Sequence, residues 1–211
     1  MGELTKFLLR GLLIGISIAA PVGPIGLLCI RLTLAEGRAT GLVSGLGAAT
    51  ADALYGCIAG FGLTFISGLL VEQQFWFRLI GGLFLCYLGV KTFLARPAEK
   101  TSPSEKSSLA GARLFKSYAS TFFLTLTNPV TILSFAAIFA GLGLASIGQD
   151  YVSAAVLVVG VFLGSALWWL TLSGGVSMVR KKVSLSVMQW LNRLSGVVIT
   201  GFGLFSLFSL I

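Results

Sequence analysis

Two motifs, Ala20-Pro21-Val22-Gly23-Pro24 and Thr127-Asn128-Pro129, interrupt long apolar stretches, one near the start of this chain and one just past its middle. Inside a lipid bilayer every backbone N–H and C=O group needs a partner, so a proline-broken span persists only where the freed groups face protein, water or a ligand. Matching breaks in two halves of a membrane protein are typical of a substrate site. The sequence therefore predicts a membrane transporter.

The composition requires the bilayer as solvent. Of the 211 residues, 56% are hydrophobic and only 10% are charged, which is too few polar side chains to cover a soluble domain. Six apolar stretches are long enough to cross a hydrocarbon core, which needs about 20 helical residues. They are 7–32, 40–68, 75–95, 114–144, 151–179 and 187–211. We expect an all-α membrane protein with six transmembrane helices, of which helices 1 and 4 are broken at proline.

The distribution of Lys and Arg predicts the orientation. If loops are assigned alternately to the two sides, Lys6, Arg10 and Arg78 lie on one side and the other twelve basic residues on the opposite side. Cytoplasmic loops are the ones enriched in Lys and Arg. We therefore expect a multi-pass protein of the bacterial inner (cell) membrane with both termini outside and the 96–113 linker in the cytoplasm. This topology accounts for the net charge of +8, and no nucleic-acid partner is expected.

A polar linker divides the apolar stretches into two groups of three. Residues 96–113 are rich in Ser, Lys and Glu and contain two prolines, a composition typical of a solvated linker. We expect one integral membrane domain made of a first three-helix repeat at 1–95, the cytoplasmic linker, and a second repeat at 114–211. Because three is an odd number of spans, the second repeat is inverted relative to the first, with a pseudo-two-fold axis in the membrane plane.

Matched residues support this repeat. The breaks align at Pro24 and Pro129, which are 105 residues apart. The third and sixth stretches share a spacing with an offset of 114 residues: Trp76, Gly82 and Gly89 in one, Trp190, Gly196 and Gly203 in the other. Glycine and tryptophan also recur in membrane helices as packing and interface residues, but their agreement with the matched breaks favours a repeat.

The breaks predict a site for a zwitterion. After each break a new helix begins, and its first N–H groups point unpaired into the gap with a partial positive charge of about half a unit. Proline suits the first position of a helix, Asn128 suits the N-cap, and Gly23 permits close backbone approach. A carboxylate would bind the N–H groups, and an ammonium would bind carbonyls or an acid. The substrate-binding residues expected are Pro21, Gly23, Pro24, Thr127, Asn128 and Pro129.

Asp52 is the one acidic residue well inside a predicted span. A charge at the centre of a membrane helix costs roughly 2.5–3.5 kcal/mol on insertion scales, and such residues usually belong to an ion path or a proton relay. We expect Asp52 to couple proton movement to transport, with Tyr55, one helical turn along, as its partner. The alternative is a structural carboxylate held by a neighbouring hydroxyl or amide.

Small residues and tryptophans suggest how the helices pack. Two stripes of glycine at helical spacing are typical of close helix packing in membranes. The stripes are Gly37, Gly41 and Gly45 entering the second span, and Gly160 and Gly164 in the fifth. Trp168 and Trp169 follow the second stripe, and we expect them in the aromatic belt at the membrane interface.

Metal and thiol chemistry are not indicated by the sequence. There is no histidine, and Cys29, Cys57 and Cys86 fall singly in three different spans. This pattern matches neither a CxxC pair nor a soft-metal cluster. We expect no metal site and no cofactor other than a coupling ion, H⁺ or Na⁺.

Several short motifs follow one another in a specific order. They are Ala20-Pro21-Val22-Gly23-Pro24, Leu34-Ala35-Glu36-Gly37-Arg38-Ala39-Thr40-Gly41 with Gly45, Gly47 and Asp52, Tyr87-Leu88-Gly89, Asn128-Pro129, and Trp190-Leu191-Asn192-Arg193-Leu194-Ser195-Gly196. In these motifs the chain resembles the LysE/RhtB family of amino-acid exporters. The resemblance implies a six-span inner-membrane protein that exports amino acids such as lysine, arginine, threonine or homoserine, driven by an ion gradient. It also implies Pro24, Asp52 and Asn128-Pro129 as site positions.

The sequence as a whole predicts a secondary active transporter, and not an enzyme, that exports a small amino acid or derivative by proton antiport through alternating access. A single buried acid favours a neutral substrate, because a dicationic one would need more than one acid. Na⁺ stays open as the coupling ion, since broken-helix carbonyls can also hold it. The expected partners are the amino-acid substrate and the lipid bilayer, and among proteins only a homodimer is kept open.

Three alternatives are retained. A cation or heavy-metal exporter of the same superfamily would show competition between substrate and metal ions. A CcdA-like thiol redox carrier also has two proline-broken repeats, and Cys29 lies near the first break, but the second break has no cysteine beside it. Function that survives thiol alkylation would exclude that carrier. A membrane scaffold would give no solute flux in proteoliposomes.

Overall fold

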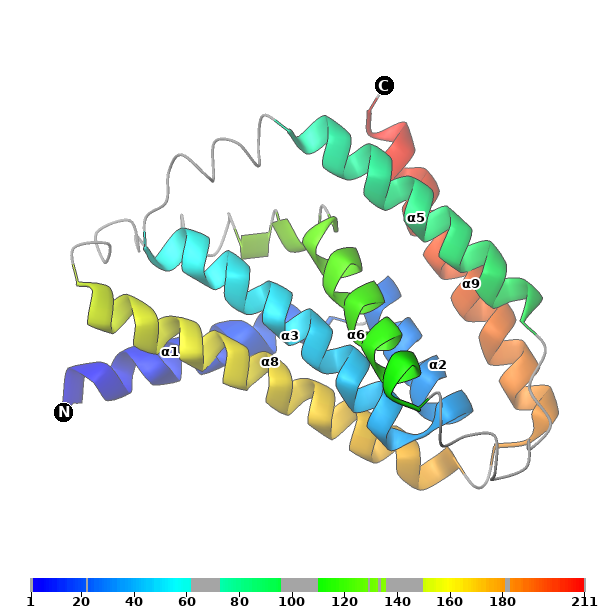
Figure 1. Ribbon diagram of the computed structural model, residues 1–211, viewed down its shortest axis with the longest axis horizontal. Helices are drawn as coiled ribbons and strands as arrows, with labels where there is room; N and C mark the ends of the chain where they lie inside the picture. Colours follow the sequence, from blue (N-terminus) through cyan, green and yellow to red (C-terminus); the bar gives the residue numbers. More distant parts are fainter. Residues whose placement is uncertain are drawn as a thin grey trace.

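The computed structural model describes residues 2–21, 23–61, 73–95, 110–128, 130–132, 134–135, 150–180 and 183–210, and every regular element in these ranges is a helix (Figure 1). The named helices are α1 (Gly2–Ala19), α2 (Pro24–Glu36), α3 (Arg38–Gly60), α5 (Gln74–Leu94), α6 (Ala110–Leu126), α8 (Tyr151–Val179) and α9 (Leu185–Phe208). Residues 130–132 and 134–135 are also helical. The prediction of an all-helical membrane protein is confirmed for the described part of the chain.

The first predicted span is broken as the prolines require. α1 ends at Ala19 and α2 begins at Pro24, with a bend of 81° between the two helices. Proline occupies the first helical position, where its missing N–H leaves no gap in the hydrogen-bond ladder. Gly23 is the N-cap, and its carbonyl accepts from the N–H of Leu27 at 3.1 Å.

Long apolar helices account for part of the predicted membrane crossing. Among the described residues, three helices are long and apolar enough to span a bilayer, at Arg38–Ile58, Tyr151–Val179 and Ser186–Phe208, and the bent pair α1 and α2 makes a fourth. α8 has the predicted bounds 151–179. The six-span arrangement stays a prediction, because residues 62–68 and 136–144 of two predicted spans lie outside the described ranges.

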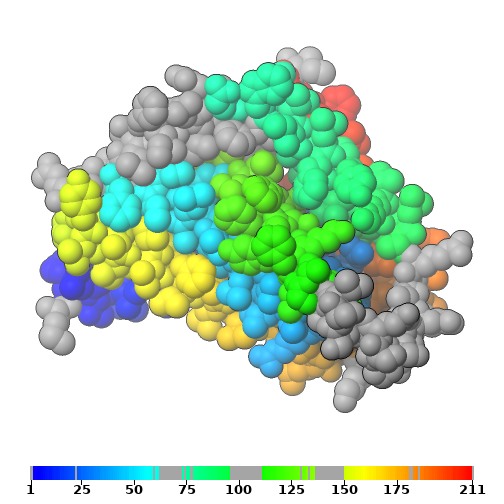
Figure 2. Space-filling view, in the orientation of Figure 1, coloured from blue at the N-terminus to red at the C-terminus, as the bar shows by residue number. Residues whose placement is uncertain are grey.

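The helices pack largely in pairs. α1 packs along α8, α6 packs along α3, and α3 and α8 pack on each other. α5 and α9 lie side by side along one edge of the molecule, away from α1 and α8 (Figure 1). Figure 2 shows α6 seated between α3 and α5 on the viewed face. α2 lies against α3, α8 and α9.

Two glycines allow main chains to touch in the α1–α8 and α3–α6 pairs. Gly160 of α8 faces α1, and Gly47 of α3 faces α6. A Cβ at either position would strike main-chain atoms of the facing helix, at Leu8, Gly11 and Leu12 for Gly160 and at Tyr118 and Phe122 for Gly47. In the absence of a hydrophobic driving force within lipid, such close packing is what holds membrane helices together. The two glycines are 113 residues apart.

The predicted stripe of Gly37, Gly41 and Gly45 is wrong at its first member. Gly37 lies in the turn between α2 and α3 with φ of +112°, a conformation that favours glycine. Gly41 lies against Thr33 of α2, and Gly45 against Trp169 of α8. Gly41 and Gly45 therefore pack against two different helices, α2 and α8, and do not form one continuous stripe against a single neighbour.

The contacts between α5 and α9 come in pairs related by 114 residues. Gly82 lies against Gly203, and Gly89 lies against Gly196, so the two helices run antiparallel. Adding 114 to Gly82 gives Gly196, and adding 114 to Gly89 gives Gly203. If each residue is replaced by its equivalent 114 positions away, the Gly82–Gly203 contact becomes the Gly196–Gly89 contact.

Hydrogen bonds at the two ends of this helix pair follow the same relation. The guanidinium of Arg78 donates to the carbonyl of Ser209 at 3.0 Å, and the side-chain amide of Asn192 donates to the carbonyl of Ala95 at 3.0 Å. Asn192 follows Arg78 by 114 residues, and Ser209 follows Ala95 by 114. Each bond supplies a donor to a carbonyl at the C-terminal end of the neighbouring helix, where such groups lack helical partners.

Substitution of glycine by alanine should have opposite effects at Gly160 and Gly201. Gly160→Ala should lower the free energy of unfolding by about 1–3 kcal/mol, because the new Cβ meets backbone that cannot yield. At Gly201 of α9 no atom of the described residues lies within 4 Å of an added Cβ, so Gly201→Ala should be neutral or stabilising by up to about 1 kcal/mol. Unfolding in detergent micelles measures both, and equal effects would contradict the packing.

Candidate functional site

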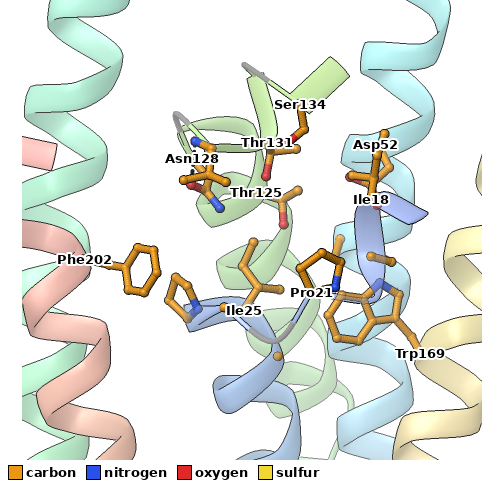
Figure 3. Close-up of a pocket in the computed structure, with 16 residues that line it drawn as sticks. Ile18, Pro21, Ile25, Asp52, Thr125, Asn128, Thr131, Ser134, Trp169 and Phe202 are labelled. Atoms are coloured by element: carbon orange, nitrogen blue, oxygen red, sulfur yellow. Dashed lines mark hydrogen bonds between the residues drawn. The ribbon is translucent and has the colours of Figure 1, made fainter. Parts of the chain in front are cut away.

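A cavity of about 210 Å³ lies where the two broken spans meet (Figure 3). Because one water needs only roughly 10–15 Å³ of such space, the cavity admits a small organic solute. In Figure 3, Asp52 and Trp169 lie on one side and Phe202 on the other. The lining residues are Ile18, Ala19, Pro21, Gly23, Pro24, Ile25 and Gly26 from the first span, Thr125, Asn128, Val130, Thr131 and Ser134 from the fourth, and Ala48, Asp52, Trp169 and Phe202.

The N-terminus of α2 forms one wall of the cavity and has no side-chain cap. Its N-cap is Gly23, which has no side chain to accept from the first N–H groups of the helix. Pro24, Ile25 and Gly26, the first three residues of α2, all line the cavity. The unpaired N–H groups of a first helical turn, together with the helix dipole, make this wall electropositive.

The second break also presents a helix start, but one that is capped from within the chain. The side-chain oxygen of Asn128 accepts from the N–H of Val130 at 3.1 Å, and its carbonyl accepts from the N–H of Ile132 at 3.1 Å. This confirms Asn128 as the predicted N-cap. Pro129 lies outside the described residues. Thr131 and Ser134 add hydroxyl groups to the same wall.

Asp52 projects from the middle of α3 and is only 2% exposed. The hydroxyl of Ser165 on α8 donates to its Oδ2 atom at 2.7 Å, and Trp169 Nε1 donates to the Ser165 oxygen at 3.1 Å. The other oxygen, Oδ1, is buried with no hydrogen-bond partner among the described residues. The two carboxylate oxygens thus differ, because Ser165 holds one in place and the other has no such bond.

The hydrogen bond of the Tyr55 hydroxyl goes to a main-chain group, whereas the sequence suggested Asp52 as its partner. This hydroxyl donates to the carbonyl of Leu126, the last residue of α6. Since the last carbonyls of a helix have no helical partner, this bond satisfies one of the groups freed by the second break. Ser165 takes the expected place beside Asp52, from 113 residues further along the chain.

The structure divides the predicted binding residues into two groups. Pro21, Gly23, Pro24 and Asn128 line the cavity. Thr127 is not among the described residues that line it, because its hydroxyl donates to the carbonyl of Phe123 at 2.8 Å and its side chain faces Gly81 of α5.

Sequence reasoning missed several residues of the site. Trp169 was expected in an interfacial belt, which is wrong, because this side chain is 3% exposed and faces the cavity. Ser165 and Phe202 carry no local signal, since they reach the site only through helix packing. Thr131 and Ser134 lie within six residues of Asn128, so their distance from the break could have identified them.

The thiols lie elsewhere in the fold. Cys29 is buried, and its Sγ donates to the carbonyl of Gly41 at 3.2 Å in the packed core of α2, α3 and α8. Cys29, Cys57 and Cys86 are free thiols and do not line the cavity. Among the described residues no group of three His, Cys, Asp or Glu side chains is close enough to hold a metal ion. A thiol relay between the two breaks thus has no residues to carry it.

Interrupted helices whose ends meet at a buried cavity, beside a buried carboxylate, define a membrane transporter. The comparison with known families agrees with this class. The chain belongs to the LysE type translocator family, whose family model matches residues 16–209.

Relatives of known sequence support this membership. The chain is 29% identical over 199 residues to a Bacillus subtilis (strain 168) protein named "Putative amino acid efflux protein YcgF", covering 92% of this chain and 91% of the relative. It is 26% identical over 178 residues to "Uncharacterized membrane protein YahN" of Escherichia coli (strain K12), covering 83% and 77% of the two chains. No solved structure gives a significant match.

Tyr55→Phe should destabilise the protein more than Tyr118→Phe. Loss of the Tyr55 hydroxyl leaves the Leu126 carbonyl buried without a donor, at a cost of about 1–3 kcal/mol. Tyr118 donates at 2.9 Å to Thr50, whose own hydroxyl bonds to the carbonyl of Leu46 at 2.8 Å, so its loss should cost only about 0.5–1.5 kcal/mol. Unfolding midpoints in detergent compare the two, and a smaller effect at Tyr55 would refute its role at the break.

Proposed function

We propose that the protein is a secondary active transporter that exports a small amino acid or derivative across the bacterial inner membrane, by proton antiport and alternating access. One observation carries the proposal: the uncapped N-terminus of α2 and the buried side chain of Asp52, whose Oδ1 atom has no hydrogen-bond partner among the described residues, line the same cavity at a membrane-helix break. Family membership supports transport. The name of the Bacillus relative, an amino-acid efflux protein, supports the substrate class and the direction.

The cavity suits the two charged groups of an amino acid. A substrate carboxylate binds the N–H groups at Ile25 and Gly26, since an anion at a helix N-terminus gains from both the free donors and the dipole. The ammonium binds the last carbonyls of α1, because this helix ends at the same break and its last carbonyls have no helical partner. Of the two helix starts, the one at Asn128 has its first donor occupied by the cap. The α2 start is therefore the carboxylate site, and the Asn128 side is left to orient the substrate through hydroxyls.

A neutral side chain fits the remaining walls best. Ile18, Ile25, Ala48 and Phe202 give the cavity an apolar surface. Asp52 is the one acidic side chain among the described residues that line it. A cationic side chain would need a second acid or further carbonyls to offset its desolvation. The proposed substrate is thus a neutral amino acid.

We also propose the two inverted three-helix repeats, 1–95 and 114–211, joined by the cytoplasmic 96–113 linker, with both termini outside. The antiparallel α5 and α9 pair, with contacts related by 114 residues, supports a two-fold relation. Gly47 and Gly160, which are 113 residues apart and have equivalent roles, support it as well. Inverted repeats allow the same cavity to open to either side of the membrane in turn.

Asp52 is the proposed proton-coupling residue, with H⁺ rather than Na⁺ as the coupling ion. Its free oxygen can bind a proton while the other oxygen stays on Ser165. Tyr55 supports coupling indirectly, by holding the second break at Leu126 in place. A homodimer stays a prediction.

Proteoliposomes loaded with a labelled amino acid and exchanged against an unlabelled panel test the substrate class. Neutral amino acids such as leucine or threonine should exchange faster than lysine or arginine. Vesicles reconstituted with a variant that fills the site, Gly26→Trp, provide the control and should show background flux. If none of the amino acids in the panel gives flux above background, the proposed function is refuted. If lysine exchanges faster than the neutral amino acids, the proposal of a neutral substrate is refuted.

Asp52→Asn separates coupling from binding. This variant keeps the shape of the carboxylate but cannot take up a proton, so accumulation driven by a pH gradient should fall at least about tenfold. Counterflow of substrate without a gradient should persist. If both activities persist, Asp52 does not couple; if both are lost in a folded protein, Asp52 is part of the substrate site.

A further inference from the structure

The carboxylate of Asp52 and the hydroxyl of Ser165 meet where α3 and α8 cross. They are 2.7 Å apart and buried, at 2% and 0% exposure. Gly160 and Gly47, the two glycines with equivalent roles in these helices, differ by 113 residues. Asp52 and Ser165 differ by the same 113. Asp52 of the first proposed repeat is thus bonded to Ser165, which occupies the equivalent position in the second proposed repeat.

Contacts on either side of this pair follow the same offset. Gly45 of α3 lies against Trp169 of α8, and Gly56 of α3 lies against Val158 of α8. Adding 113 to Gly45 gives Val158, and adding 113 to Gly56 gives Trp169, so one contact maps onto the other. The two helices are antiparallel, and Asp52–Ser165 lies between the two contacts. We infer that the pseudo-two-fold axis implied by these relations passes close to this hydrogen bond.

The cavity is built from both halves around the same axis. Its two main walls come from the corresponding breaks, at Pro24 and at Asn128, and Asp52 lines it. A two-fold rotation exchanges those breaks and exchanges positions 52 and 165. Asp52 lines the cavity and Ser165 lies directly behind it, bonded to its Oδ2 atom. Under the proposed two-fold relation, a longer acidic side chain at position 165 would be presented to the same cavity from the side of the other break.

We propose that Ser165 is the positioning residue for the coupling carboxylate, and that positions 52 and 165 are interchangeable sites for it. This inference rests on the proposed function. Ser165 holds Oδ2 of Asp52 and is itself fixed by Trp169 Nε1, so Oδ1 is the oxygen without a hydrogen bond among the described residues. Without that bond both oxygens lack a partner, and the carboxylate is free to turn away.

An acid moved to position 165 finds suitable donors there. A serine at position 52 can donate to one oxygen of the relocated carboxylate, as Ser165 does to Asp52 in the wild type. Trp169 Nε1, now bonded to the Ser165 oxygen at 3.1 Å, is placed to donate to it as well. A buried charge tolerates relocation when such donors are present.

The test is an exchange of the two residues, measured as amino-acid accumulation driven by a pH gradient in proteoliposomes. Asp52→Ser alone should lower accumulation at least about tenfold, and Asp52→Ser with Ser165→Asp should restore it to within about threefold of wild type. As a control, Asp52→Ser with Ser173→Asp puts an acid at another buried position of α8, away from the axis, and should restore nothing. Elution as a single folded species in detergent is required of each variant.

A folded double variant as inactive as Asp52→Ser would overturn the inference, and so would equal rescue by the Ser173 control. Ser165→Ala provides an independent measure that removes only one hydroxyl. It should lower the maximal rate of gradient-driven transport about tenfold while leaving the KM of exchange within about twofold; an unchanged rate refutes the positioning role. Absence of wild-type flux would instead refute the proposed function itself.

Discussion

Backbone N–H and C=O groups cannot be left unpaired in hydrocarbon, and this constraint governs the whole structure. Two broken spans release such groups near the centre of the protein. At the second break the chain satisfies its own groups, because Tyr55 donates to the Leu126 carbonyl and Asn128 accepts from Val130. At the first break the helix starts on Gly23, which has no side chain to cap it. The two breaks are therefore capped unequally, and the N-terminus of α2 is the one without a side-chain cap.

Close helix packing brings the remaining polar groups to this point. Gly47 and Gly160 allow main chains to touch in the α3–α6 and α1–α8 pairs, and Gly45 gives space to Trp169. In lipid this packing replaces the hydrophobic effect as the cause of helix association. It also brings α3 and α8 close enough for short side chains on the two helices to form a hydrogen bond with each other. Asp52 and Ser165 meet for that reason.

Local features of the sequence predicted local features of the structure well. α2 begins at Pro24, Asn128 caps the helix after the second break, and α8 runs over the expected 151–179. Each of these depends on a few neighbouring residues. The predictions that failed concerned contacts between helices. Helical spacing suggested Asp52 as the partner of the Tyr55 hydroxyl, which bonds to Leu126, and the depth of Trp169 in its span suggested an interfacial belt. Such patterns state which residues share a face or a depth, and not which helix packs on them.

The sequence by itself determined the solvent, the helices, the two breaks and the family, because composition, proline chemistry and motif order are properties of the chain alone. Only the tertiary structure decided what surrounds the breaks. Trp169 and Phe202 reach the cavity from helices far along the chain, Ser165 reaches Asp52 from the same helix as Trp169, and Thr127 turns toward α5 instead. The physical reason is that a helix fixes the direction of a side chain relative to its own axis, whereas packing between helices fixes where that axis lies.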